Sequence, residues 1–139
     1  MSAEVRALIL CDFAQARGNL LTVVSGGISQ TTSAVVPTVL NLMVAIVVEV
    51  PPLEVGLVHE LKLRLQRVRD SKPLVEIVAA LKVELHQPQL GQPAIACAAA
   101  DLRGAVLDEF GGYEVWCSVD GGVGTDAAFW LVESDAAVS

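Results

Sequence analysis

The chain has 139 residues; 53% of them are hydrophobic, only 18% are charged, and the formal net charge is −7. This length is enough for one domain whose core needs no disulfide or metal. Nine basic residues against sixteen acidic ones give no cationic surface for a phosphate backbone, so no nucleic-acid partner is expected. The one basic concentration alternates along a single predicted strand, as on a solvated sheet face: Lys62, Arg64, Arg67 and Arg69.

The composition also argues against a membrane-spanning or disulfide-bonded protein. The longest apolar stretch, residues 34–50, is interrupted by Pro37 and Asn41 and falls short of the roughly 20 apolar residues of a membrane helix. The N-terminal residues lack the pattern of a signal peptide, so we expect a cytoplasmic protein. The odd cysteine count, without any C-x-x-C pair, predicts buried free thiols rather than disulfides or a zinc site: Cys11, Cys97 and Cys117.

The N-terminal third predicts two short strands and a connection. Residues 5–12 predict a strand with Val5, Ala7, Ile9 and Cys11 on one face. Residues 14–19 end in Gly18-Asn19, a pair suited to a turn that leads into a hairpin strand at residues 20–25. Gly26-Gly27 predicts a bulge or kink, and residues 31–37 predict a Ser/Thr-rich connection that crosses between sheets.

The middle of the chain gives the clearest strand patterns. Residues 40–50 are apolar on both faces, which predicts a central strand covered on both sides or placed at a subunit contact. Pro51-Pro52 ends this strand, and residues 53–58 form a loop with room for one helical turn. Residues 59–69 alternate leucines with charged residues, the period of two that a half-buried strand requires.

The C-terminal half continues the pattern. Residues 74–85 predict a strand that pairs back, and residues 94–101 predict an alanine-rich strand. Residues 113–120 and 127–133 predict a final hairpin. The remaining segments are predicted as a loop at 86–93, an irregular stretch at 102–110 and a tail at 134–139. With about eight strands and frequent turns, we expect a single all-β domain over residues 1–133, a two-layer antiparallel β-sandwich of Greek-key, immunoglobulin-like type.

The segment Glu109-Phe110-Gly111-Gly112-Tyr113 predicts a tyrosine corner. In such corners of Greek-key sandwiches, a tyrosine hydroxyl bonds back to upstream backbone and fixes the strand that crosses between the sheets. The prediction concerns structure rather than activity. It places the Tyr113 hydroxyl in the interior of the protein.

The run from Gly121 to Asp126 matches G-G-x-G-x-D, the start of a calcium-binding nonapeptide repeat. A single copy is present, whereas each calcium in a β-roll is shared between stacked copies. We therefore interpret the run as a flexible hairpin loop, with Asp120 and Asp126 as weak candidate cation ligands. A phosphate cradle would also need a lysine and a helix after the glycines, and neither follows.

Catalytic candidates are sparse. A nucleophilic site would have to combine Cys11 and Asp12, or one of the serines, with His59 or His86. Both histidines fall at predicted strand ends that face solvent. No G-x-S-x-G elbow is present in the sequence. We therefore expect no catalytic residue, no cofactor-binding residue and no metal ligand.

Trp116 and Trp130 fall in the last two predicted strands, on the face opposite the row of Tyr113 and its apolar neighbours. Cross-strand pairing would bring the two indoles together. An outward pair of tryptophans serves either as a protein contact or as a sugar-binding platform, unless a loop or another strand covers it.

Several segments resemble a family of small bacterial proteins of unknown function. These are residues 7–15, ending in Cys11-Asp12, residues 18–28 with the Gly26-Gly27 kink, residues 42–52, and residues 112–130 with a Gly-x-Tyr hairpin. The resemblance implies a β-sandwich. It implies no activity and no site residues.

The sequence therefore predicts a non-catalytic structural or interaction protein that forms a homo-oligomer or is a subunit of a larger assembly. The apolar excess, the doubly apolar strand and the outward tryptophans favour this function. The alternative is a small-ligand or carbohydrate-binding module that uses Trp116, Trp130 and the loop from Gly121 to Asp126.

Overall fold

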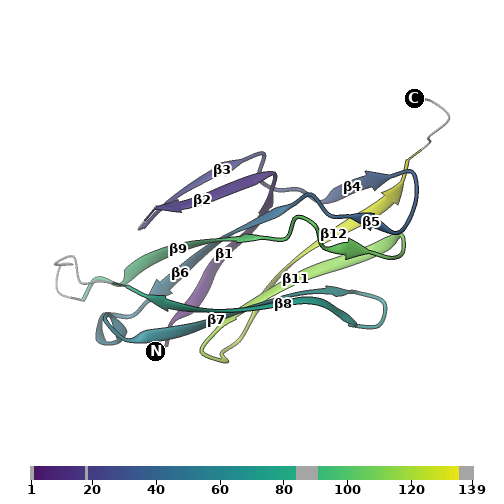
Figure 1. The fold of residues 1–139 in the computed structure, drawn as a ribbon. Coiled ribbons are helices and arrows are strands. Elements are labelled where there is room, and N and C mark those ends of the chain that lie inside the picture. Colours follow the sequence, from purple (N-terminus) through teal and green to yellow (C-terminus); the bar gives the residue numbers. More distant parts are fainter. Residues whose placement is uncertain (1, 18, 84–90, 135–139) are drawn as a thin grey trace.

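The computed structural model describes residues 2–17, 19–83 and 91–134, and it is all-β, as predicted (Figure 1). These residues form twelve strands and one short 3-10 helix, η1 (Pro52–Glu54). No helix among them is long and apolar enough to cross a bilayer. The strands are β1 (Glu4–Cys11), β2 (Phe13–Arg17), β3 (Leu20–Val24), β4 (Gln30–Ser33), β5 (Thr38–Val39), β6 (Met43–Val50), β7 (Val58–Arg67), β8 (Pro73–Lys82), β9 (Ala94–Asp101), β10 (Val106–Leu107), β11 (Gly111–Val119) and β12 (Thr125–Glu133).

The strands form two larger sheets and two small ones. The larger sheets have the orders β1-β6-β9 and β4-β12-β11-β7-β8, while β2 pairs with β3 and β5 pairs with β10. Every pairing is antiparallel except that of β4 with β12, which is parallel. The prediction of a purely antiparallel arrangement is wrong at this edge. The two strands lie near opposite ends of the sequence, so no hairpin fixes their relative direction.

Both larger sheets contribute side chains to one hydrophobic core. Alternation along β7 buries Leu61, Leu63 and Leu65, as the sequence predicted. The same cluster contains every second residue of β11 and β6 together with two large residues of β12: Tyr113, Val115, Cys117, Val119, Val44, Ile46, Val48, Val50, Phe129 and Leu131. The Tyr113 and Phe129 rings stack with their centroids 5.7 Å apart.

The central strand β6 is apolar on both faces because a second cluster covers its outer face. Met43 and Ala45 of β6 pack there with Cys11 and Ala14, and Leu21 of β3 packs against them. The β2–β3 hairpin therefore covers this end of the sheet (Figure 1). The predicted central position is confirmed, and the cover comes from the chain itself.

Four short strands lie in segments that were predicted as turns or connections. Strand β2 occupies the predicted turn, so β3 pairs with β2 rather than with the first strand, and Arg17 lies opposite Leu20. Strands β4, β5 and β10 lie in or beside the predicted connection and irregular stretch. Strands of two to five residues are too short to display a period.

The long predicted strands are present with shifted ends. The strand predicted at residues 40–50 begins at Met43, although Leu40 and Leu42 are buried. The strand predicted at 59–69 spans Val58–Arg67, and the strand predicted at 74–85 spans Pro73–Lys82. Most of the predicted loop at 86–93 and of the predicted tail lies outside the described residues.

Candidate functional site

The outer face of the five-stranded sheet carries both tryptophans. Pairing of β11 with β12 sets Trp116 opposite Asp126 and Trp130 opposite Gly112, so both indoles share the face that points away from the core. Their predicted outward orientation is confirmed. Their predicted proximity is wrong, since four residues of strand separate the two positions, about 13 Å.

Trp116 is half-buried because its neighbours enclose the indole. The Arg64 guanidinium carbon of β7 lies 5.1 Å from the centre of the ring, within the range of a cation–π contact. On another side, a Cβ atom on Gly124 would overlap the indole, so only glycine fits there. Trp130, in contrast, is 58% exposed. The two tryptophans therefore do not form one continuous aromatic surface.

His59 is buried, with only 3% of its surface exposed, so its predicted position at a solvent-exposed strand end is wrong. Its Nδ1 lies 2.6 Å from Asp120 Oδ2 and its Nε2 lies 3.0 Å from the Glu54 carbonyl oxygen. Both partners accept hydrogen bonds, so the ring donates from both nitrogens as an imidazolium. The hydrogen bond to Asp120, with smaller contributions from Glu54, raises the pKa of His59 although burial opposes this.

Asp120 precedes the glycine-rich loop, and its side chain hydrogen-bonds to two residues of β7. Asp120 has a φ of 52°, and its other carboxylate oxygen accepts a hydrogen bond of 2.8 Å from the Glu60 N–H. Burial acts to raise the pKa of Asp120, but the bonds from His59 and Glu60 lower it below the ordinary value. The carboxylate thus joins the loop to β7. Because both of its oxygens accept hydrogen bonds there, Asp120 is a poor cation ligand. Within residues 2–17, 19–83 and 91–134, no group of three potential ligands could hold a metal ion.

The cysteines do not form a nucleophilic site with the described histidine. The Cys11 thiol is buried and donates to the Met43 carbonyl oxygen at 3.5 Å, while His59 is bound to Asp120 and Glu54. Burial raises the pKa of Cys117 to about 11. Cys97 is half-buried, so the prediction of buried thiols is wrong for this residue. His86 lies outside the described residues.

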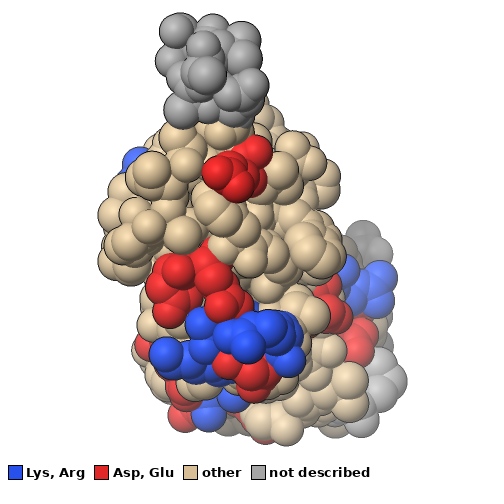
Figure 2. Space-filling view, turned by 90° about the vertical axis from the view of Figure 1, so that its right-hand side faces the viewer, with Lys and Arg blue, Asp and Glu red and all other residues tan. Residues whose placement is uncertain are grey.

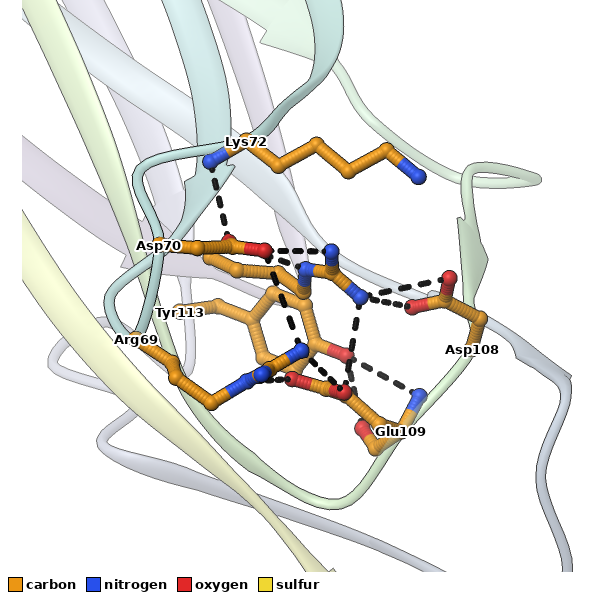
Figure 3. A network of polar contacts seen from close by, with 7 residues as sticks. Arg69, Asp70, Lys72, Asp108, Glu109 and Tyr113 are labelled. Atoms are coloured by element: carbon orange, nitrogen blue, oxygen red, sulfur yellow. Dashed lines mark hydrogen bonds and ion pairs between the residues drawn. The ribbon is translucent and has the colours of Figure 1, made fainter.

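A polar network joins the β7–β8 turn to the segment that precedes β11 (Figure 3). Arg67, at the end of β7, is buried and donates to Asp70 at 2.6 and 3.2 Å. Its Nη1 lies 3.3 Å from Asp108 and 3.4 Å from Glu109. The prediction that Arg67 belongs to a solvated sheet face is wrong, because the strand ends here and the guanidinium turns toward these three carboxylates.

The tyrosine corner lies beside this network. The Tyr113 hydroxyl donates to the Glu109 carbonyl oxygen at 2.6 Å, which confirms the predicted bond to upstream backbone (Figure 3). Arg69 binds the Glu109 side chain through two hydrogen bonds of 3.0 Å. Figure 2 shows the end of the molecule that carries the β7–β8 turn, where blue and red groups gather in one band. Because Arg67 and Arg69 are paired with carboxylates from both segments, the band holds the β7–β8 turn against the segment that precedes β11.

Apolar side chains are exposed at several separate places. Val39 and Val106 form a cross-strand pair on β5 and β10, and both are exposed. Phe13 and Val24 form a similar exposed pair on the β2–β3 hairpin. The outermost strand β8 adds Val78, which is 57% exposed. These positions provide surface that association could cover.

The model of the family of unknown function DUF6941 matches residues 6–130 of the chain. The chain belongs to this family. No curated protein sequence matches it. The predicted resemblance to a family of unknown function is confirmed, while a bacterial source stays a prediction.

In this DUF6941 chain, sequence reasoning missed the His59–Asp120 pair and the role of Arg67. His59 and Asp120 lie 61 residues apart in the sequence, a separation that no local pattern connects. For Arg67, the break in alternation at Arg67-Val68 was the available signal. The turn that follows this break begins with Asp70, whose side chain accepts a hydrogen bond from the Lys72 N–H at 3.1 Å and also binds Arg67.

Proposed function

We propose that this chain is a non-catalytic interaction protein that self-associates, or joins a larger assembly, through its exposed sheet edges and apolar side chains. The observation that carries the proposal is the ten-residue strand β8, which lies at the edge of the five-stranded sheet with β7 as its strand neighbour and Val78 exposed. An edge strand presents unpaired N–H and C=O groups that a second strand can bind. The expected location of this assembly is the cytoplasm.

The proposed scaffold is a two-layer β-sandwich of Greek-key, immunoglobulin-like type. The order β12-β11-β7-β8 matches the G-F-C-C′ order of such domains, and β1-β6-β9 matches A-B-E. The Tyr113 corner lies at the start of β11, the position that strand F occupies. This correspondence supports a sandwich whose function depends on its surfaces.

A non-catalytic role agrees with the chemistry of the titratable groups. His59 has no free basic nitrogen, because both ring nitrogens donate to acceptors. The raised thiol pKa of Cys11 and Cys117 disfavours the reactive thiolate. The carboxylates around Arg67 are paired with its guanidinium and hold the β7–β8 turn against the segment that precedes β11.

Light scattering across a hundredfold range of protein concentration tests this proposal. We expect a particle of at least two chains that dissociates on dilution. A mass of 14.6 kDa, the mass of one chain, at every concentration and with no co-purifying partner would contradict the proposal.

The second candidate is a small-ligand or carbohydrate-binding module, which the 58% exposure of Trp130 favours. Exposed indoles stack on apolar sugar faces. A glycan panel tests it by tryptophan fluorescence in the unmodified chain and in Trp130→Ala. A saturable shift that Trp130→Ala abolishes supports binding, and the absence of any shift removes this candidate.

A further inference from the structure

We propose that strand β8 (Pro73–Lys82) pairs antiparallel with β8 of a second copy of this chain, about a two-fold axis at Ala79. This inference rests on the proposed function, since it names the partner and the register of the association. The two five-stranded sheets then continue into one sheet across the axis. The interface is isologous: if residue i of one copy contacts residue j of the second copy, then residue j of the first copy contacts residue i of the second.

The outer edge of β8 is available for pairing within the described part of the chain. There, β8 hydrogen-bonds to β7 on one side, and no other strand pairs with it. Ala79 and Ala80, at the proposed axis, are exposed, and so is Val78. Small side chains at the centre let two backbones approach to sheet distance without a clash.

The charges of β8 are self-complementary about Ala79. The strand carries one acidic and one basic residue, Glu76 and Lys82, each three positions from Ala79 on opposite sides. In an antiparallel pair centred on Ala79, Glu76 of each copy therefore lies directly opposite the partner copy's Lys82, and the axis produces this contact twice. Glu76 already lies 3.3 Å from Lys62 within its own chain, which holds its carboxylate on the outer face. Opposite charges placed directly across a strand pair stabilise it.

The same axis matches the apolar residues. Ile77 lies opposite Leu81 of the second copy, and Val75 lies opposite Val83. All four are half-buried and pack against the core cluster from its edge. Association would cover the sides of these residues that face the open edge, so the two cores would meet along one seam.

Other strand edges lack this combination. Strand β9 also lies at the edge of a sheet, but its only charged residue is Asp101, and its Cys97 thiol contacts the Asn19 carbonyl oxygen of the β2–β3 turn at 3.5 Å. Strand β4 has four residues and no large apolar side chain. Strand β1 also lies at a sheet edge and carries Glu4 and Arg6, but an axis between these two residues lies at Val5, one residue from the start of the strand, so only residues 4–6 of β1 could pair about it. About Ala79, residues 76–82 of β8 can all pair, so the self-pairing is assigned to β8.

Charge reversal at the two positions, followed by mixing, tests the register. Glu76→Lys and Lys82→Glu each place like charges opposite one another twice in a homodimer. The dimer dissociation constant of each variant alone should therefore rise by about tenfold or more. An equimolar mixture of the two variants restores opposite charges at both contacts and should form a heterodimer nearly as stable as the unmodified dimer. Sedimentation velocity on the separate and mixed variants measures this.

Matched controls carry the same charge changes away from the edge. Glu60→Lys, on β7, and Lys72→Glu, in the β7–β8 turn, should leave dimerisation unchanged. Thermal melting of each variant at a concentration where it is monomeric confirms that it is folded. As an independent measure, Ala79→Cys should cross-link to its own copy under mild oxidation, and Ala80→Cys, whose copies lie diagonally across the pair, should cross-link far less.

Each outcome decides between the two proposals. If the unmodified chain is monomeric at all concentrations, the proposed function fails and this inference fails with it. If the chain oligomerises but neither reversed variant changes the mass and mixing has no effect, only the β8 interface is overturned. Weakening in both separate variants with recovery on mixing supports the pairing about Ala79.

Discussion

Replacing Tyr113 with phenylalanine removes a single oxygen atom from the interior of the protein. The Tyr113 side chain has no exposed surface, and its hydroxyl donates to the Glu109 carbonyl oxygen at 2.6 Å. Burial raises the pKa of the phenol, so the hydroxyl keeps its proton at neutral pH. The variant keeps the ring and its stacking on Phe129 but leaves the Glu109 carbonyl without this donor. The expected loss is about 1–2 kcal/mol in the free energy of unfolding, the cost of a buried acceptor without its bond.

Urea denaturation followed by tryptophan fluorescence measures this loss, and a thermal melt should show a Tm lower by about 3–8 °C. Trp130→Phe is the control, because Trp130 is 58% exposed and its replacement should change stability by no more than about 0.5 kcal/mol. An unchanged urea midpoint in Tyr113→Phe would refute the assignment of a stabilising tyrosine corner. A loss equal to that of Trp130→Phe would do the same.

Three further substitutions and reactions test other parts of the structure. Gly124→Ala places a methyl group into the Trp116 indole and should lower stability by about 1–3 kcal/mol in urea melts, with most of the cost absent when Trp116→Ala is present as well. The pKa of His59 is raised in the folded state, so its stabilising contribution is complete below the unfolded pKa near 6.5 and is lost as the pH rises through the folded pKa. His59→Gln should therefore flatten the dependence of the free energy of unfolding on pH over that window. An unchanged slope would contradict the buried imidazolium. In alkylation of the native protein followed by peptide mass mapping, Cys97 should react well before Cys117, since burial raises the pKa of Cys117 to about 11, and equal rates would contradict this.

The long strands could be predicted from the sequence because their burial is one-sided and local. Leu61, Leu63 and Leu65 alternate with charged residues, and this period alone assigns both the strand and its inward face. The Tyr113 corner was predictable for the same reason, since its partner Glu109 lies four residues away. Both signals lie within a few consecutive residues, so they can be interpreted without knowing which distant segments lie nearby.

Contacts between distant segments could not be predicted in this way. The cover over the second face of β6 comes from the β2–β3 hairpin, whose five-residue strands are too short to show which face they bury. His59 is polar and begins an alternating run, so its sequence context favours exposure. The hydrogen bonds to Asp120, in the turn of the last hairpin, and to the Glu54 carbonyl oxygen make its burial favourable.

The candidate interface follows a similar division. The alternation and the charges of Glu76 and Lys82 are visible in the sequence, but that β8 is the outermost strand is a property of the sheet order. A strand of the same composition in the middle of a sheet would have no edge to offer. The symmetric placement of Glu76 and Lys82 about Ala79 can contribute to association only because β8 lies at the edge of its sheet.

Amide hydrogen exchange of residues 73–82 as a function of protein concentration tests the central claim most directly. If β8 pairs with a second copy, the outward N–H groups of this segment become protected as concentration rises, in step with the particle mass, while those of the solvent-facing β7–β8 turn do not. Exchange in β8 that is the same at every concentration, whatever the particle mass, would contradict the account.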